Sequence, residues 1–196
     1  AALGNNTTGS RNVANGYGSL GSNTTGSYNV AFGYGTLDAN TTSAYNVALG
    51  YNALTSSTGG NNVAIGGKCM ENNTTGDKNV AVGRAALDSN TTGTENVTMG
   101  YAAGEKITTG DRNVLIGPWA CDTVTTGSDN VCIGENAGAG QVTTTDGDLY
   151  IARSNTAAGN ALTWIAGNSS GTCYQGDNTT TWSTVSDRRL KKNITD

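Results

Sequence analysis

The chain repeats one short pattern of apolar and polar positions along most of its length. The dipeptide Asn-Val recurs every 17 residues, with a single step of 16, and opens segments such as NVAFGY, NVALGY and NVAIGG. Eight copies begin at Asn12, Asn29, Asn46, Asn62, Asn79, Asn96, Asn113 and Asn130, and a worn ninth copy, DLYIAR, begins at Asp148. A fixed period of this kind is the signature of stacked repeat architectures.

Each copy predicts a short strand, a corner, a second short strand and a polar loop. Val, a small residue and a larger apolar residue form the first strand, which a glycine ends; pairs such as Ser19-Leu20 and Thr36-Leu37 form the second. The loops, SNTTGS and its variants, are rich in residues that favour turns. Because the 16-residue step falls in the loop TSSTGG, we expect the loops to lie outside the packed ladder.

A unit this short cannot bury its own apolar residues, but stacked copies align each Val on the next Val and each Leu on the next Leu. The sequence therefore predicts an all-β parallel β-solenoid over residues 1–151, about 40 Å long at the usual strand spacing. Side chains alternate along a strand, so Val30 and Phe32 should face one way, and Asn29 and Ala31 the other. The small alanines indicate that this second face is also closely approached, which another chain of a homo-oligomer could supply.

The repeat drifts after Gly100. The Leu position becomes Gly104, Cys121 and Gly138, while the loop asparagine becomes Ile107, Val124 and Val142. We interpret this as an apolar side chain that moves about three positions along the coil, with a gradual change of cross-section. The period ends after residue 152, and residues 152–185, with Trp164, Tyr174 and Trp182, predict a β-rich connector.

Composition narrows the functional classes. Charged residues make up 13% of the chain, about half the usual globular share. A net charge of −4 gives no reason to expect nucleic acid, and no apolar run approaches the roughly 20 residues that span a bilayer, so no membrane insertion is expected. The absence of histidine excludes Ser-His-Asp and Cys-His catalysis and histidine-based zinc sites, and we expect no metal or cofactor. Since the chain begins with Ala1 rather than Met, we expect a piece or a processed product.

Several repeated side chains invite two readings. A column of tyrosines, Tyr17, Tyr34, Tyr51 and Tyr101, could hold sugar rings or stabilise stacked coils, and we favour the structural role. The Asn-Val asparagines predict a ladder of hydrogen bonds. Cys69 and Cys132 replace Ala, and Cys121 replaces Leu, so we favour buried small apolar side chains over metal or redox chemistry; spacing leaves disulfide connectivity open.

The NVAIG and NVALG units resemble the head repeats of trimeric autotransporter adhesins. The resemblance covers residues 1 to about 150 and implies a left-handed parallel β-roll that assembles as a homotrimer. The chain differs from many such heads in its 17-residue period, with an inserted N-T-T-G loop.

The closing segment SDRRLKKNI resembles the start of the S74-type intramolecular chaperone of phage tailspikes, endosialidases and other tail fibres. The matching residues are Ser186, Asp187, Arg189, Leu190, Lys191 and Ile194. The resemblance implies a trimer whose precursor cuts itself between Ser186 and Asp187, with Ser186 as nucleophile and Lys191 as base. A lysine can serve as base where burial and nearby positive charge lower its pKa. Residues 186–196 would be the first part of that domain, and only ten residues follow Ser186, so we expect this chain to be inactive.

Together these features predict a trimeric tail-fibre segment of a virion that engages a host cell-surface glycan or protein. Trp164, Trp182 and the four tyrosines are the candidate binding residues. The alternative is a trimeric adhesin head on a bacterial cell surface. Ice binding through the repeated Thr-Thr pairs is less favoured, because adjacent threonines in a strand point to opposite faces.

Overall fold

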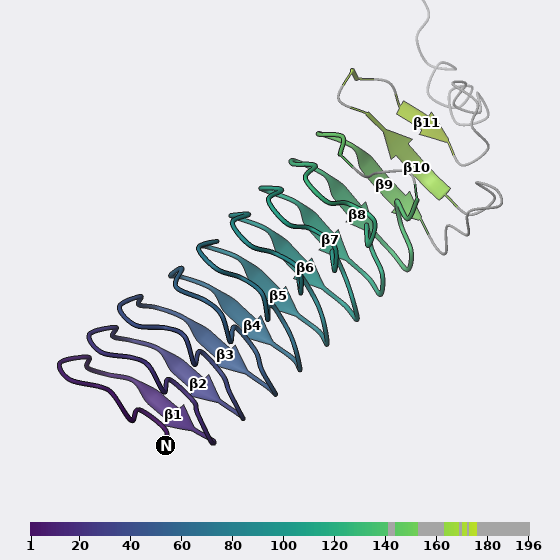
Figure 1. The fold of residues 1–196 in the computed structure, drawn as a ribbon. Helices are drawn as coiled ribbons and strands as arrows, with labels where there is room; N and C mark the ends of the chain where they lie inside the picture. Colours follow the sequence, from purple (N-terminus) through teal and green to yellow (C-terminus); the bar gives the residue numbers. More distant parts are fainter. Residues whose placement is uncertain (141–143, 153–162, 169, 172, 176–196) are drawn as a thin grey trace, which may run out of the picture.

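The computed structural model describes residues 1–140, 144–152, 163–168, 170–171 and 173–175. They form one sheet of eleven strands that follow each other in chain order (Figure 1). The strands are β1 Val13–Asn15, β2 Val30–Phe32, β3 Val47–Leu49, β4 Val63–Ile65, β5 Val80–Val82, β6 Val97–Met99, β7 Val114–Ile116, β8 Val131–Ile133, β9 Leu149–Ala152, β10 Thr163–Gly167 and β11 Cys173–Gln175. Strands β1 to β9 pair in parallel, whereas β9, β10 and β11 pair antiparallel.

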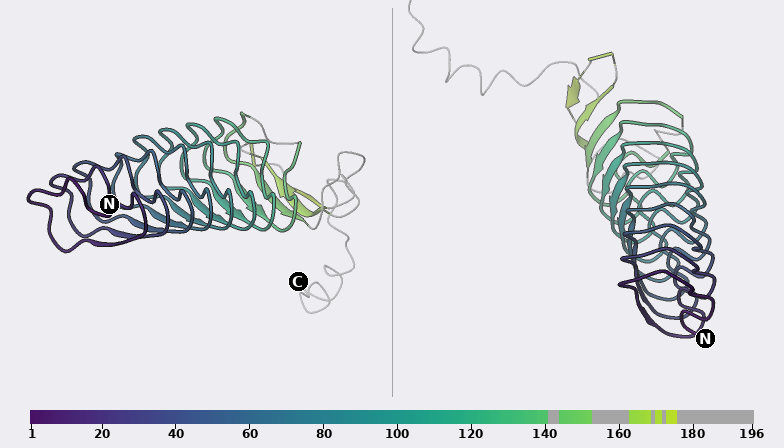
Figure 2. Two further views of the ribbon diagram at one scale, coloured as in Figure 1. Left: turned by 60° about the horizontal axis from the view of Figure 1, so that its bottom comes forward. Right: turned by 90° about the vertical axis from the view of Figure 1, so that its left-hand side faces the viewer.

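The predicted stacking register is confirmed. Val13 pairs with Val30, and the same Val-on-Val pairing continues from strand to strand as far as β8. The ninth copy is also confirmed, because Leu149 of β9 pairs with Val131 of β8. Each 17-residue unit is therefore one turn of a parallel β-solenoid, here called a coil, and the strands line one side of the stack (Figure 2).

The prediction of a second strand in each coil was wrong. The segment around the Leu position is a turn, in which Asn52 and Leu54 both take positive φ values of 53° and 52°. Two left-handed residues so close together break an extended backbone. The turn still stacks on its neighbour through backbone hydrogen bonds, such as that from Leu54 N to Cys69 O at 3.0 Å.

A glycine follows each strand from β1 to β8, because the next coil lies against it. Gly50 has φ of 136°, and a Cβ added there would lie 2.5 Å from the carbonyl oxygen of Gly66 in the following coil. A side chain would meet both the backbone strain of positive φ and this contact. The corner of each coil therefore depends on glycine.

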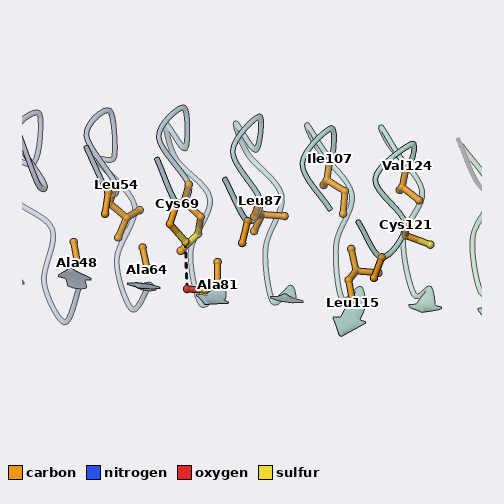
Figure 3. Packing of buried hydrophobic residues seen from close by; sticks show 14 of the residues in the cluster. Ala48, Leu54, Ala64, Cys69, Ala81, Leu87, Ile107, Leu115, Cys121 and Val124 are labelled. Atoms are coloured by element: carbon orange, nitrogen blue, oxygen red, sulfur yellow. Dashed lines mark hydrogen bonds between the residues drawn. The ribbon is translucent and has the colours of Figure 1, made fainter. Parts of the chain in front are cut away.

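The strand side chains alternate as predicted, but the assignment of the two faces needs a correction. Ala31, Ala48 and the equivalent alanines are fully buried inside their own solenoid, where they pack against the Leu column of the same chain (Figure 3). The close approach that we expected from another chain is thus made within the chain. Phe32 and its equivalents face outward, with half of the Phe32 side chain exposed.

The predicted asparagine ladder is confirmed. The Asn79 side chain accepts a hydrogen bond from Asn96 N at 2.9 Å and donates one to Gly93 O at 2.8 Å. Its own backbone N donates to the Asn62 side chain at 3.0 Å. The same pattern joins each coil to the next, and these buried amides connect the strand side of the stack to the loop side.

The loops are part of the ladder, contrary to our expectation. Thr24 N donates to Thr41 O at 2.8 Å, and Thr58 N donates to Thr74 O at 2.7 Å across the shortened copy. The missing residue follows Thr58, at the second threonine of the pair, whose side chain is exposed in other coils, as at Thr25. The deletion is tolerated because the first threonine keeps its place in the ladder.

The loop asparagines form a second ladder of hydrogen bonds between coils, which ends where the sequence replaces asparagine with an apolar residue. Asn40 donates to Asn23 at 2.9 Å, and Asn90 donates to Asn73 at 2.7 Å. In the next coil the position is Ile107, which is fully buried, and the Asn90 side-chain oxygen has no hydrogen-bond partner. The predicted move of an apolar side chain toward the loop is confirmed for Ile107 and for Val124.

At this transition one core position loses its side chain and neighbouring core positions gain larger ones. Leu115 stands where earlier coils have Ala, and Gly104 stands where they have Leu. A Cβ at Gly104 would lie 2.6 Å from Leu115 Cδ1 and 3.2 Å from Ile107 Cδ1. Loss of the side chain at residue 104 therefore makes room for two larger neighbours.

Two of the cysteines form a disulfide that the sequence did not reveal. Cys121 in the Leu column is bonded to Cys132 in the Ala column of the next coil, and both are fully buried. The expectation of buried cysteine is confirmed, and the disulfide connectivity that the sequence left open is Cys121–Cys132, so our preference for apolar packing over redox chemistry was wrong for this pair. Cys69 is free and buried, and burial raises the pKa of its thiol to about 12, so it packs as a small apolar side chain.

The Asn79→Ala variant tests the asparagine ladder. The substitution leaves the buried Gly93 carbonyl and Asn96 N–H without their partner, so we expect a loss of about 2–5 kcal/mol in the free energy of unfolding. Asn72→Ala is the matched control, because the Asn72 side chain is exposed, and it should change stability by less than about 0.5 kcal/mol. Urea unfolding measures both; equal losses would contradict a ladder role.

The disulfide is tested by peptide mapping. Trypsin releases residues 113–153 as one peptide that contains both Cys121 and Cys132. Alkylation in denaturant without reductant should leave this peptide unmodified, and prior reduction should add two alkyl groups. Cys132→Ala should cost about 2–3 kcal/mol of unfolding free energy under oxidising conditions. Alkylation of both residues without reductant would exclude the bond.

Candidate interaction surface

The outward side of the sheet carries two parallel columns of apolar side chains, which we call the outer sheet face. One column is the Val that begins each strand from β1 to β8, and the other is the strand residue two positions later. The second column contains Phe32, Leu49, Ile65, Val82, Met99, Ile116 and Ile133, most of which are exposed. Phe32 is 51% exposed and Leu49 is 44% exposed. The face thus presents apolar groups in every coil from β2 to β8.

This surface is unusual for a protein in water. Single exposed apolar residues are common, but contiguous apolar patches on a soluble monomer are small. Parallel sheets are also normally covered on both faces. The inner face of this sheet packs on its own turns, whereas among the described residues no segment covers the outer sheet face of β1 to β8 (Figures 1 and 2).

Three of the four tyrosines in the predicted column form one stack. Tyr17, Tyr34 and Tyr51 stack in sequence, with ring centroids 5.4 and 5.5 Å apart. Their ring faces cover each other, so Tyr34 has mainly its ring edge and hydroxyl free for a ligand. This geometry supports the structural reading that we favoured, because a sugar stacks on a ring face.

Tyr101 belongs to a different cluster. Its ring packs edge-on against Trp119 with centroids 5.1 Å apart, and the Arg84 guanidinium donates to its hydroxyl at 3.0 Å. Trp119 and Tyr101 are both more than one third exposed. Trp119 was not among the predicted binding residues, although it lies only three residues after Ile116 of the outer sheet face.

A second aromatic stack was not predicted. Tyr28 and Tyr45 lie just before the Asn-Val dipeptide, and their rings stack with centroids 4.9 Å apart. The Arg11 guanidinium lies over the Tyr28 ring, 5.0 Å from its centroid. The signal was present in the repeat, since these three residues occupy one position of successive copies.

Farther along the same column, ion pairs replace the aromatic contacts. Lys78 contacts Glu95 at 3.2 Å, and Arg112 contacts Asp129 at 2.7 Å. The Arg112 guanidinium holds the pKa of Asp129 below its usual value. All four side chains are about half exposed, so each pair adds little stability. Along this column, neighbouring side chains therefore interact by cation–π contact or ring stacking in the first coils and by ion pairs in the later ones.

The proposed self-cleavage residues lie outside the described part of the chain. This holds for Ser186, Asp187 and Lys191, and also for the candidate binding residue Trp182. Trp164 lies in β10. The predicted catalytic roles therefore stay predictions.

Other kinds of site find little support in the described residues. They contain no group of three or more Asp, Glu, Cys or His side chains that could hold a metal ion, and no helix with the length and hydropathy of a membrane span. Among the N-x-T sequons, the asparagines at Asn23, Asn40, Asn73 and Asn90 are fully buried, which excludes these four as glycosylation acceptors in the folded chain, whereas Asn6 is partly buried.

The threonine pairs do not form a uniform array. The first hydroxyl donates to the next coil, as from Thr24 Oγ1 to Thr41 O at 3.0 Å, while the second threonine, such as Thr25, is exposed. The shortened copy lacks this second threonine. An ice-binding surface needs an unbroken lattice of hydroxyls, so this geometry gives that alternative no further support.

The chain was compared with protein-family models, with curated proteins and with solved structures, and none of the three comparisons gives a match.

Proposed function

We propose that the chain is a structural and adhesive segment of a homotrimeric tail fibre, whose precursor is folded and then released by a C-terminal intramolecular chaperone. The observation that carries the proposal is the outer sheet face, which repeats an exposed apolar strip in successive coils. A fibre segment of this kind acts through assembly and attachment rather than through catalysis.

A copy of the same chain is the partner that fits this face best. The apolar positions recur once per coil, so a second solenoid set beside the first with its coils in register would present matching rows along the whole contact. Obligate contacts between copies are more apolar than ordinary protein surface. Three copies in a left-handed roll follow from the resemblance to trimeric adhesin heads.

The C-terminal end of the described sheet supports a junction with another unit. Strand β10 pairs antiparallel with β9, and β11 pairs antiparallel with β10, so the parallel solenoid pattern ends at β9. In the proposed fibre these strands belong to the connector between the roll and the chaperone. The chaperone resemblance of SDRRLKKNI is the reason to prefer a virion fibre over a bacterial surface adhesin, since the roll alone fits both.

A host glycan or protein would be the receptor of such a fibre. The cluster of Arg84, Tyr101 and Trp119 has the residue types that dominate binding hot spots. We add Trp119 to the candidate binding residues for this reason. The stacked Tyr17, Tyr34 and Tyr51 rank below this cluster because both ring faces of Tyr34 and one face of each of the other two are occupied by stacking.

The oligomeric state tests the proposal. Multi-angle light scattering should give three times the chain mass of 19.8 kDa. Charged substitutions on the outer sheet face, Ile65→Lys with Met99→Lys, should shift the mass toward a single chain, because two buried charges per copy would have to be desolvated.

The control is a pair of lysines on the loop side of the same coils, Thr75→Lys with Thr109→Lys, at exposed positions far along the coil from the strands. It should leave the trimer intact. Circular dichroism of all variants separates dissociation from misfolding. A wild-type protein that is a folded single chain at micromolar concentration would refute the trimer.

The self-cleavage roles require the precursor that contains the chaperone. The precursor should split between Ser186 and Asp187, and Ser186→Ala or Lys191→Ala should leave it uncut, since one removes the nucleophile and the other the base. Ser183→Ala serves as the matched control and should be cut normally. Intact mass spectrometry reads the products; normal cutting of both test variants would show that the roles are misassigned.

A further inference from the structure

Four acidic residues occupy equivalent positions in successive coils along the turn side of the solenoid. The repeat position directly after the Leu column is acidic in four successive coils, at Glu71, Asp88, Glu105 and Asp122, which we call the acidic column. Backbone hydrogen bonds from Asn72 N to Asp88 O and from Ser89 N to Glu105 O hold these coils in register. Successive carboxylates therefore start from backbones about 4.8 Å apart.

Like charges at directly paired positions destabilise a sheet, so this arrangement needs compensation. Glu71 has it, because Lys68 contacts its carboxylate at 3.1 Å and the Asn52 amide donates to it at 2.9 Å. Asp88 and Asp122 are only partly compensated, because the Oδ1 atom of each is buried and accepts no hydrogen bond. Lys68 and a backbone hydrogen bond from Glu71 favour the charged form of Asp88, and Lys106 and the backbone N–H of Asp122 itself favour that of Asp122. These two side chains are the members of the acidic column that carry a buried oxygen without a partner.

The charged groups that face these two side chains explain how they titrate. Burial is the largest cause that raises the pKa of Asp88, and the negative charges of Glu71 and Glu105 raise it further, while Lys68 opposes the shift. Burial also raises the pKa of Asp122, and Lys106 opposes it. Both carboxyl groups thus hold a proton more tightly in the folded chain than in the unfolded chain.

The sign of the effect on stability follows from this difference. Where the folded state binds the proton more tightly, the free energy of unfolding rises as the pH falls through the pKa of the folded state. Most paired carboxylates act in the opposite sense, and Asp129, whose pKa is lowered by Arg112, is the example in this chain. The acidic column is therefore a local exception to ordinary acid denaturation.

We propose that Asp88 and Asp122 form a pH-sensitive element of the solenoid: ionised, they loosen the stacking of the coils around them at neutral pH, and protonation in mild acid tightens it. The proposal concerns a single chain and does not depend on the trimer or on the chaperone. Protonation would make this part of the solenoid more stable at acidic pH than at neutral pH.

The test compares the melting temperatures of the full chain and of Asp88→Asn, Asp122→Asn and the double variant at about pH 7 and about pH 4, the latter close to the usual aspartate pKa. Asparagine keeps the shape and removes the charge. At neutral pH each single variant should melt roughly 2–4 °C above the wild type, the shift that about 1 kcal/mol gives in a chain of this size. At the acidic pH the difference should shrink, because the wild-type carboxyls become protonated. All buffers contain EDTA, so that a bound metal ion cannot produce the result.

Asp129→Asn is the control of opposite sign: it should melt slightly below the wild type at neutral pH and keep most of that small difference at about pH 4, because its lowered pKa leaves Asp129 largely ionised there. Asp88→Asn and Asp122→Asn variants that melt at or below the wild type at neutral pH would overturn the proposal. An equal gain at both pH values would overturn it too, because the gain would then come from packing rather than from charge.

Discussion

Each coil of this solenoid packs against the next repeat of the same chain, so each position along the coil must stack on its equivalent in the neighbouring coil, about 4.8 Å away. Apolar side chains meet this constraint easily, as the Leu and Ala columns show. Some buried polar side chains, such as Ser19 and Thr36, find a partner within their own coil. The Asn79 amide instead donates and accepts between coils, which explains why asparagine recurs at this position in all eight copies.

Charges meet the same constraint only by alternating or by finding a partner outside their column. Lys78 with Glu95 and Arg112 with Asp129 alternate within one column. The charges of the acidic column do not alternate, and the unfavourable electrostatic energy that results is greatest at Asp88 and Asp122. The stack therefore tolerates a substitution wherever the new side chain is chemically compatible with its equivalents in the two neighbouring coils. Where neighbouring side chains are incompatible, the solenoid is locally less stable.

Much of the fold could be predicted because a repeat reports its own register. The period alone located the strands, the Val-on-Val pairing and the asparagine ladder. The orientation of the faces was harder to predict, since alternation in a three-residue strand does not say whether Ala31 or Phe32 points inward. The turn at Leu54 was missed because a Leu at positive φ leaves no local sequence signal.

For the candidate surface, too, the repeat showed which residues share a column but not how their side chains are arranged. The tyrosine column was visible in the repeat, but the separation of Tyr101 from the stacked tyrosines depends on what the neighbouring coils place between them. The disulfide had a signal that was not used, because Leu-column and Ala-column residues of adjacent coils, such as Leu20 and Ala31, are 11 residues apart, as are Cys121 and Cys132. Spacing gains meaning once the repeat phase is known.

The central claim is that copies of the chain meet through the outer sheet face, and a distance between chains tests it most directly. Pulsed electron paramagnetic resonance would compare a spin label at Ile65→Cys with one at Thr75→Cys, each in a Cys69→Ala, Cys173→Ala background. The label at residue 65 should give the shorter distance between chains, because that side chain points toward the partner. A shorter distance at residue 75, or no coupling between chains at either site, would contradict the account.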